Sequence, residues 1–129
     1  MMAALPEVFL TTPIAHRAYH DLEQRRPENS RAAIRAAVAA GYGIEIDVQM
    51  SSDGQAMVFH DDRLDRLTRA SGRVRDRTAA DLQRTTLTHG DEGIPLLSEV
   101  MALVDGQVPL LIEIKDQDGA LGMDVGLLE

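Results

Sequence analysis

The chain has 129 residues, of which 44% are apolar and 3% aromatic, so its core must be built mainly from aliphatic side chains. Its formal net charge of −8 argues against a general nucleic-acid-binding protein, because phosphate backbones favour positively charged partners. Cysteine is absent, which excludes disulfides, thiolate catalysis and zinc–thiolate sites.

Residues 1–13 contain neither a basic segment nor a long apolar run, so we predict no signal peptide. No apolar run approaches the ~18–20 residues that span a bilayer, so we predict no transmembrane segment. The expected compartment is the cytoplasm.

The first part of the chain predicts a strand, a helix and a second strand. A short apolar strand covers residues 14–17, and Asn29 is the predicted N-cap of a helix over residues 30–40. A strand over residues 43–49 follows the helix. This order predicts a right-handed βαβ unit with parallel strands.

The strand over residues 43–49 has two different faces. Apolar residues alternate with polar ones, so Glu45 and Asp47 lie two residues apart on one face. These carboxylates repel each other unless a cation or protons intervene. A tight turn then leads to a strand over residues 55–60, which ends at His60.

The rest of the chain begins with a polar, basic excursion over residues 62–93, which includes a short capped helix over residues 78–85. We interpret its arginines as solvent-facing side chains with local aspartate partners. A helix follows over residues 94–104, with Met101 in its apolar stripe, and then a strand over residues 109–115.

Each predicted strand has ionisable residues at or near its C-terminal end. In a parallel α/β fold that edge binds ligands, and in an eight-stranded barrel it is the catalytic face. The side chains expected there are His16, Arg17, Glu45, Asp47, His60, Asp61, Glu113 and Lys115.

Together these groups indicate phosphoryl or phosphodiester chemistry. The carboxylates of Glu45, Asp47 and Glu113, with no cysteine and no His-x-x-x-His spacing, favour Mg²⁺ or Ca²⁺ over zinc. Two histidines from different strands suit a general acid and a general base, and Arg17 and Lys115 suit a phosphate. Each group alone has a structural alternative: a histidine at a strand end is often structural, and Glu113 with Lys115 suits a plain salt bridge.

The order and approximate spacing of several motifs, from residue 14 to about residue 116, resemble the glycerophosphodiester phosphodiesterase family. The motifs are His16-Arg17, Pro27-Glu28-Asn29-Ser30, Ile44-Glu45-Ile46-Asp47-Val48, Val58-Phe59-His60-Asp61, Arg66-Leu67-Thr68 and Ile112-Glu113-Ile114-Lys115.

The resemblance implies a TIM (β/α)8 barrel that hydrolyses glycerophosphodiesters to an alcohol and glycerol 3-phosphate with a divalent cation, Mg²⁺ or Ca²⁺. It also implies a small insertion after His60, at about residues 62–93. The site residues that it implies are catalytic His16 and His60, substrate-binding Arg17 and Lys115, and metal-binding Glu45, Asp47 and Glu113.

The sequence departs from the family pattern in two ways. Ala18 stands where the family usually has glycine, which costs on the order of 1 kcal/mol if that position needs a positive φ. A complete barrel takes ~250 residues, so we expect residues 1–129 to form a single partial domain, about the first half of the barrel. The chain is then a piece of a longer domain or a half-barrel that associates with a second copy.

Three functional hypotheses stay open. The first is a glycerophosphodiesterase, or the N-terminal half of one, acting on a small-molecule substrate. The second is a related phosphodiesterase of the same barrel superfamily that acts on a phospholipid head group. The third is a truncated, non-catalytic module for binding or assembly. A stability gain with Mg²⁺ or Ca²⁺ separates a working site from the third hypothesis.

Overall fold

The computed structural model describes residues 13–115. Their elements are β1 (Ile14–Ala15), the 3-10 turn η1 (Leu22–Gln24), α2 (Arg31–Ala40), β2 (Gly43–Met50), β3 (Ala56–Val58), the 3-10 turn η2 (Val74–Asp76), α3 (Ala79–Arg84), α4 (Leu97–Val104) and β4 (Leu110–Ile114). No helix among these residues is long and apolar enough to cross a membrane.

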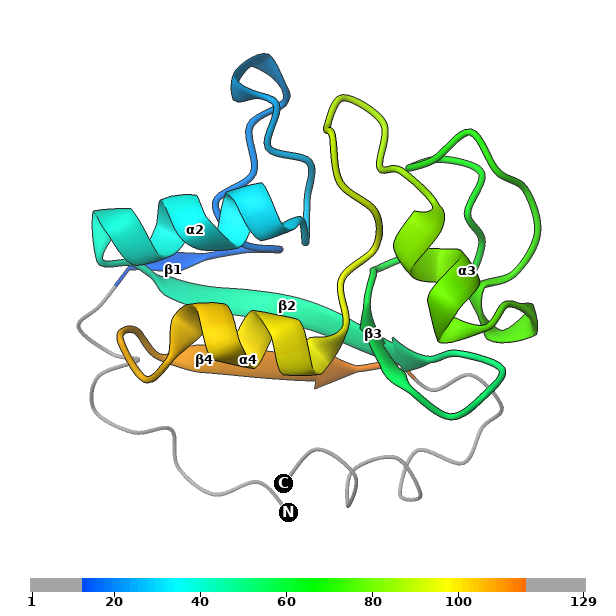
Figure 1. Cartoon of the computed structure of the whole chain (residues 1–129). Helices are drawn as coiled ribbons and strands as arrows, with labels where there is room; N and C mark the ends of the chain where they lie inside the picture. Colours follow the sequence, from blue (N-terminus) through cyan, green and yellow to red (C-terminus); the bar gives the residue numbers. More distant parts are fainter. Residues whose placement is uncertain (1–12, 116–129) are drawn as a thin grey trace.

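Strand β2 is the centre of the sheet (Figure 1). It pairs in parallel with β4 over its length on one edge, while β1 in parallel and β3 antiparallel share its other edge. The parallel pairing of β1 and β2 across α2 is the predicted βαβ unit. The strand that ends at His60 was expected to bring its charged end to the same edge as the parallel strands. It instead turns back beside β2, because only a few residues separate β2 from β3.

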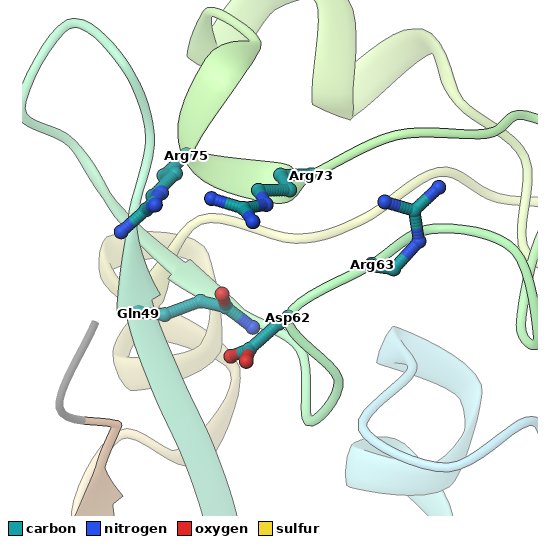
Figure 2. Close-up of a pocket in the computed structure, with 5 residues that line it drawn as sticks. All are labelled: Gln49, Asp62, Arg63, Arg73 and Arg75. Atoms are coloured by element: carbon teal, nitrogen blue, oxygen red, sulfur yellow. The ribbon is translucent and has the colours of Figure 1, made fainter. Parts of the chain in front are cut away.

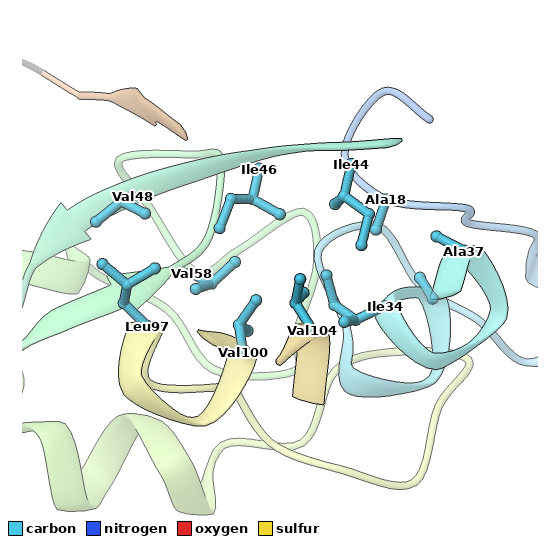
Figure 3. Packing of buried hydrophobic residues seen from close by; sticks show 11 residues of the cluster. Ala18, Ile34, Ala37, Ile44, Ile46, Val48, Val58, Leu97, Val100 and Val104 are labelled. Atoms are coloured by element: carbon cyan, nitrogen blue, oxygen red, sulfur yellow. The ribbon is translucent and has the colours of Figure 1, made fainter. Parts of the chain in front are cut away.

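Helices α2 and α4 lie side by side over one face of the sheet (Figure 1). Ile34 of α2 and Val100 of α4 pack with the alternate residues Ile44, Ile46 and Val48 of β2 (Figure 3). All five are buried. The period-two pattern of β2 therefore divides its side chains as predicted, with the apolar set under the helices and the carboxylates on the opposite face.

The excursion after His60 has a hydrophobic cluster of its own, which joins Met57 and Phe59 of the hairpin to Leu64, Leu82 and Ile94. These side chains are buried. The segment is therefore packed against the end of β3. Its charged side chains project from a segment that has a hydrophobic core of its own.

Two details of the helices differ from the sequence-based prediction. Ser30, not Asn29, caps α2: its side chain accepts a hydrogen bond from the Ala33 N–H. Asn29 takes a left-handed backbone, with φ of 57°, which lets its amide reach the sheet. Met101, expected in the apolar stripe of α4, is 53% exposed because it lies at the margin of the face that meets β2.

Candidate active site

Three carboxylates meet on the sheet face that the helices leave open. Glu45 and Asp47 alternate on β2, and the register pairs Asp47 with Glu113 of β4. Each carboxylate offers an oxygen that lies within 4.8 Å of those of the other two. Glu45 and Asp47 are only 7% and 1% exposed, whereas Glu113 is exposed.

The electrostatics of this trio suit a hard divalent cation. Burial, together with the nearby charge of Asp47, raises the pKa of Glu45 above its usual value. Oε2 of Glu45 is buried and has no hydrogen-bond partner among the described residues. A buried carboxylate oxygen without a donor, beside two further carboxylates, fits the oxygen ligands that Mg²⁺ and Ca²⁺ prefer.

The Asn29 side-chain amide bonds both the carboxylate and the backbone N–H of Asp47. Its Nδ2 donates to Asp47 Oδ2 at 3.1 Å, and its Oδ1 accepts from the Asp47 backbone N–H at 3.3 Å. Asn29 was assigned in sequence only as a helix cap. Its contact with β2 was missed, although a left-handed conformation is common for asparagine and redirects its side chain.

The end of β1 turns sharply at Arg17 and Ala18, whose φ angles are 54° and 65°. This turn aims the Arg17 backbone N–H at Glu45 Oε1 at 3.2 Å and directs the guanidinium to the site. Residue 18 therefore needs a positive φ, so alanine is under backbone strain there. Its methyl group is buried, at 1% exposure.

Five side chains form a closed ring of hydrogen bonds beside the carboxylates. Arg17 donates to His60 and Glu28, Arg66 donates to Glu28 and Asp61, and Asp61 bonds His60. The distances lie between 2.6 and 3.1 Å. Hydrogen bonds from Arg66 lower the pKa of Asp61 to about 2, against the opposing effect of burial.

The hydrogen bonds around His60 indicate which of its two ring nitrogens carries a hydrogen. An arginine has no acceptor, so the contact of 3.0 Å between Arg17 Nη2 and His60 Nε2 requires a lone pair on Nε2. On the other side of the ring, Nδ1 lies 2.8 Å from Asp61 Oδ1 and must carry the hydrogen. The geometry therefore favours the His60 tautomer with its hydrogen on Nδ1.

The remaining predicted site residues lie around this centre. His16 places Nε2 at 3.5 Å from Glu45 Oε1, and its side chain is 69% exposed. Lys115 lies two residues after Glu113, just beyond the end of β4. Its backbone N–H donates to the Val48 carbonyl. The structure thus brings His16, Arg17 and His60 next to the carboxylate trio.

Glu28 and Arg66 had no assigned place in the site. Glu28 appeared in the sequence only as part of a motif, but its carboxylate accepts hydrogen bonds from Arg17 and Arg66. Arg66 was counted with solvent-facing arginines of the excursion. The signal available in sequence was their position within two of the family-like motifs.

A sequence profile of the Glycerophosphoryl diester phosphodiesterase family matches residues 16–127. The chain is 37% identical over 113 residues to a glycerophosphodiester phosphodiesterase of Bacillus altitudinis, in an alignment that covers 82% of this chain and 45% of that protein. It is 36% identical over 116 residues to one from Caldanaerobacter subterraneus, covering 84% of this chain and 46% of that protein.

Solved structures give the same result. A phosphodiesterase of Oleispira antarctica, in complex with the product sn-glycerol-3-phosphate, matches with a TM-score of 0.72 at 30% identity, covering 84% of this chain and 47% of that one. A glycerophosphodiester phosphodiesterase of Thermotoga maritima matches with a TM-score of 0.69 at 34% identity, covering 88% and 49%. The predicted fold class, a partial TIM (β/α)8 barrel, is confirmed, and the chain spans about half the length of these relatives.

Proposed function

The chain belongs to the glycerophosphoryl diester phosphodiesterase family, and on this basis we propose that the protein hydrolyses glycerophosphodiesters to glycerol 3-phosphate and an alcohol. The observation that carries the proposal is the meeting of a carboxylate trio with two histidines and an arginine from separate elements. No single one of these groups is specific, but their combination suits the cleavage of a phosphodiester.

Glu45, Asp47 and Glu113 are the proposed ligands of a divalent cation, Mg²⁺ or Ca²⁺. A cation held by these residues would supply positive charge that stabilises the negative charge of the phosphate. Asn29 keeps the Asp47 carboxylate oriented. Oε2 of Glu45 has no hydrogen-bond partner among the described residues, so it is free to act as a metal ligand.

Arg17 and Lys115 are the proposed phosphate-binding residues. The Nε of Arg17 is buried without a hydrogen-bond partner among the described residues, 3.9 Å from Asp47 Oδ2. A phosphate oxygen satisfies this nitrogen. As the guanidinium turns to the phosphate, it releases Nε2 of His60 for proton transfer.

His16 and His60 are the proposed acid–base pair. One imidazole takes the proton of the attacking water or substrate hydroxyl as its oxygen bonds to phosphorus, and the other gives a proton to the alkoxide that leaves as the P–O bond breaks. Where the nucleophile is a substrate hydroxyl, water then opens the cyclic phosphate to give glycerol 3-phosphate. Asp61 holds the Nδ1 hydrogen of His60 throughout, so that the exchange takes place at Nε2. An ordered pair of this kind contributes ~10²–10⁴-fold to the rate.

The test is hydrolysis of glycerophosphocholine by the 129-residue chain with Mg²⁺ or Ca²⁺ and with chelator. We expect cation-dependent turnover that His16→Ala abolishes and His20→Ala, which removes an exposed histidine from the next loop, retains. Cation-independent turnover, or turnover that survives His16→Ala, would contradict the proposal. Light scattering on the same samples tests the proposal that two copies associate to complete the barrel.

A further inference from the structure

A cavity of about 330 Å³ opens next to the candidate active site, and arginines dominate its lining (Figure 2). Arg63 and Asp62 come from the segment after His60, Arg73 and Arg75 from η2 and its N-terminal flank, and Gln49 from the end of β2. All four charged residues are exposed, so the cavity is open to solvent. Nothing in the proposed chemistry uses these arginines.

Gln49 lies between this cavity and the carboxylate trio. It follows Asp47 on the same face of β2, roughly 7 Å further along the strand. Its side-chain Nε2 donates to the carbonyls of Phe59 and Asp61 at 2.9 and 2.7 Å, on either side of His60. The cavity therefore begins where the His60 segment ends, within reach of a substrate bound at the carboxylates.

The charge of the lining favours an anion. Three guanidinium groups and one carboxylate leave a net charge of +2 around one small space. Arg63 is paired with Asp65 at 3.1 Å outside the lining, while the Arg73 guanidinium makes no hydrogen bond or ion pair within residues 13–115. Figure 2 shows the Arg73 and Arg75 guanidinium groups on the same side of the cavity, above the Gln49 amide and the Asp62 carboxylate.

The ligand that matches this charge is a phosphate monoester. Such a group carries about −1.5 to −2 charges at pH 7 and offers three acceptor oxygens, and guanidinium forks bind it in a bidentate manner. The glycerol part of the substrate is uncharged and common to all members of the substrate class. The alcohol part varies, and it is the part that can bring a second phosphate.

We infer that the protein acts on glycerophosphodiesters whose alcohol carries a phosphate monoester, which binds between Arg73, Arg75 and Arg63. This inference rests on the proposed function, since it concerns the other end of the same substrate. It gives the basic segment a role beyond the solvated surface expected from sequence.

The test compares glycerophosphoglycerol with the same compound phosphorylated on its second glycerol, so that the two substrates differ only in the monoester. We expect kcat/KM to be at least about tenfold higher for the phosphorylated compound, the size of one charged hydrogen bond. Arg73→Gln should abolish this preference. Arg69→Gln, which removes an exposed arginine of the same segment outside the cavity, should retain it.

A wild-type protein without the preference, a preference that survives Arg73→Gln, or an equal loss in Arg69→Gln would overturn the inference. If neither compound is hydrolysed, the proposed function fails, and binding measured by calorimetry in chelator decides the inference alone. A phosphorylated compound that binds about tenfold more tightly than its partner to the wild type, but not to Arg73→Gln, supports the cavity as a binding site. Equal dissociation constants overturn it.

Discussion

Arg17 and His60 share a hydrogen bond of 3.0 Å in which the imidazole is the acceptor. The guanidinium has only donors, so this contact fits the tautomer of His60 in which Nε2 carries a lone pair. Asp61 Oδ1 lies 2.8 Å from Nδ1 on the other side of the imidazole, so the two contacts together favour the Nδ1–H tautomer.

The first prediction concerns the tautomer of His60. In the ligand-free protein near pH 8, the ¹⁵N NMR spectrum should show Nδ1 protonated and Nε2 unprotonated. In Asp61→Asn the Nδ1 hydrogen loses its charged acceptor, so the imidazole is held less firmly, and kcat should fall by about 10²-fold or more. A predominant Nε2–H tautomer in the wild type would contradict the ring of hydrogen bonds.

The second prediction concerns Arg66, which joins Asp61 to Glu28. Arg66→Gln should lower kcat by about tenfold with a smaller change in KM, because it loosens the carboxylate that orients His60. Stability should change by less than about 1 kcal/mol, since the Arg66 side chain is 53% exposed. Arg66→Lys cannot bond both carboxylates in the same fork and should recover only part of the activity. Wild-type kinetics in Arg66→Gln, with Arg69→Gln as the control, would show that the ring has no catalytic effect.

Periodicity and end signals were sufficient to predict much of the fold. The alternation in β2 predicted the division of its side chains between two faces, and the predicted helix over residues 30–40 is α2, whose Ile34 and Ala37 pack in the core. Gly41 ends α2 with a positive φ of 75°, as a C-terminal glycine does. These are local properties, and local sequence is enough to predict them.

The parts of the site that could not be predicted depend on backbone turns and long-range contacts. Asn29 reaches Asp47 only because its backbone is left-handed, and Glu28 reaches Arg66 across 38 residues of sequence. The antiparallel course of β3 brings Phe59, the residue before His60, alongside Asp47. No periodic pattern encodes these meetings, because each depends on the path of the chain in space.

The third prediction concerns acid stability. The pKa of Asp61 is lowered from 3.8 to about 2, so folding favours the carboxylate, and this contribution is complete above about pH 4. It is lost as pH falls through about 2. Between pH 4 and pH 2 the free energy of unfolding should therefore fall more steeply in the wild type than in Asp61→Asn, by about 1 kcal/mol after screening of the exposed arginine. Parallel curves from urea unfolding would contradict the ion pair.

The fourth prediction concerns Glu45, which is buried beside a like charge. In chelator, Glu45→Gln should raise the free energy of unfolding by on the order of 1 kcal/mol, because it removes the repulsion with Asp47. With increasing Mg²⁺ or Ca²⁺, the melting temperature of the wild type should rise and that of the variant should not. Glu92→Gln, which alters a carboxylate paired with Arg35 away from the site, is the control and should respond as the wild type does. A cation response that survives in Glu45→Gln would remove Glu45 from the proposed ligands.

The fifth prediction concerns Ala18, where a left-handed backbone and a buried methyl group coincide. Ala18→Val should destabilise the protein by about 2 kcal/mol or more, because a β-branched side chain is strongly disfavoured at positive φ and the packed core has no room for it. Ala18→Gly gains on the order of 1 kcal/mol by relief of backbone strain but loses about 0.8 kcal/mol of buried methyl, so stability should stay nearly unchanged. Urea unfolding measures both. A valine variant as stable as the wild type would mean that residue 18 does not hold this turn, and then the approach of Arg17 to Glu45 would need another explanation.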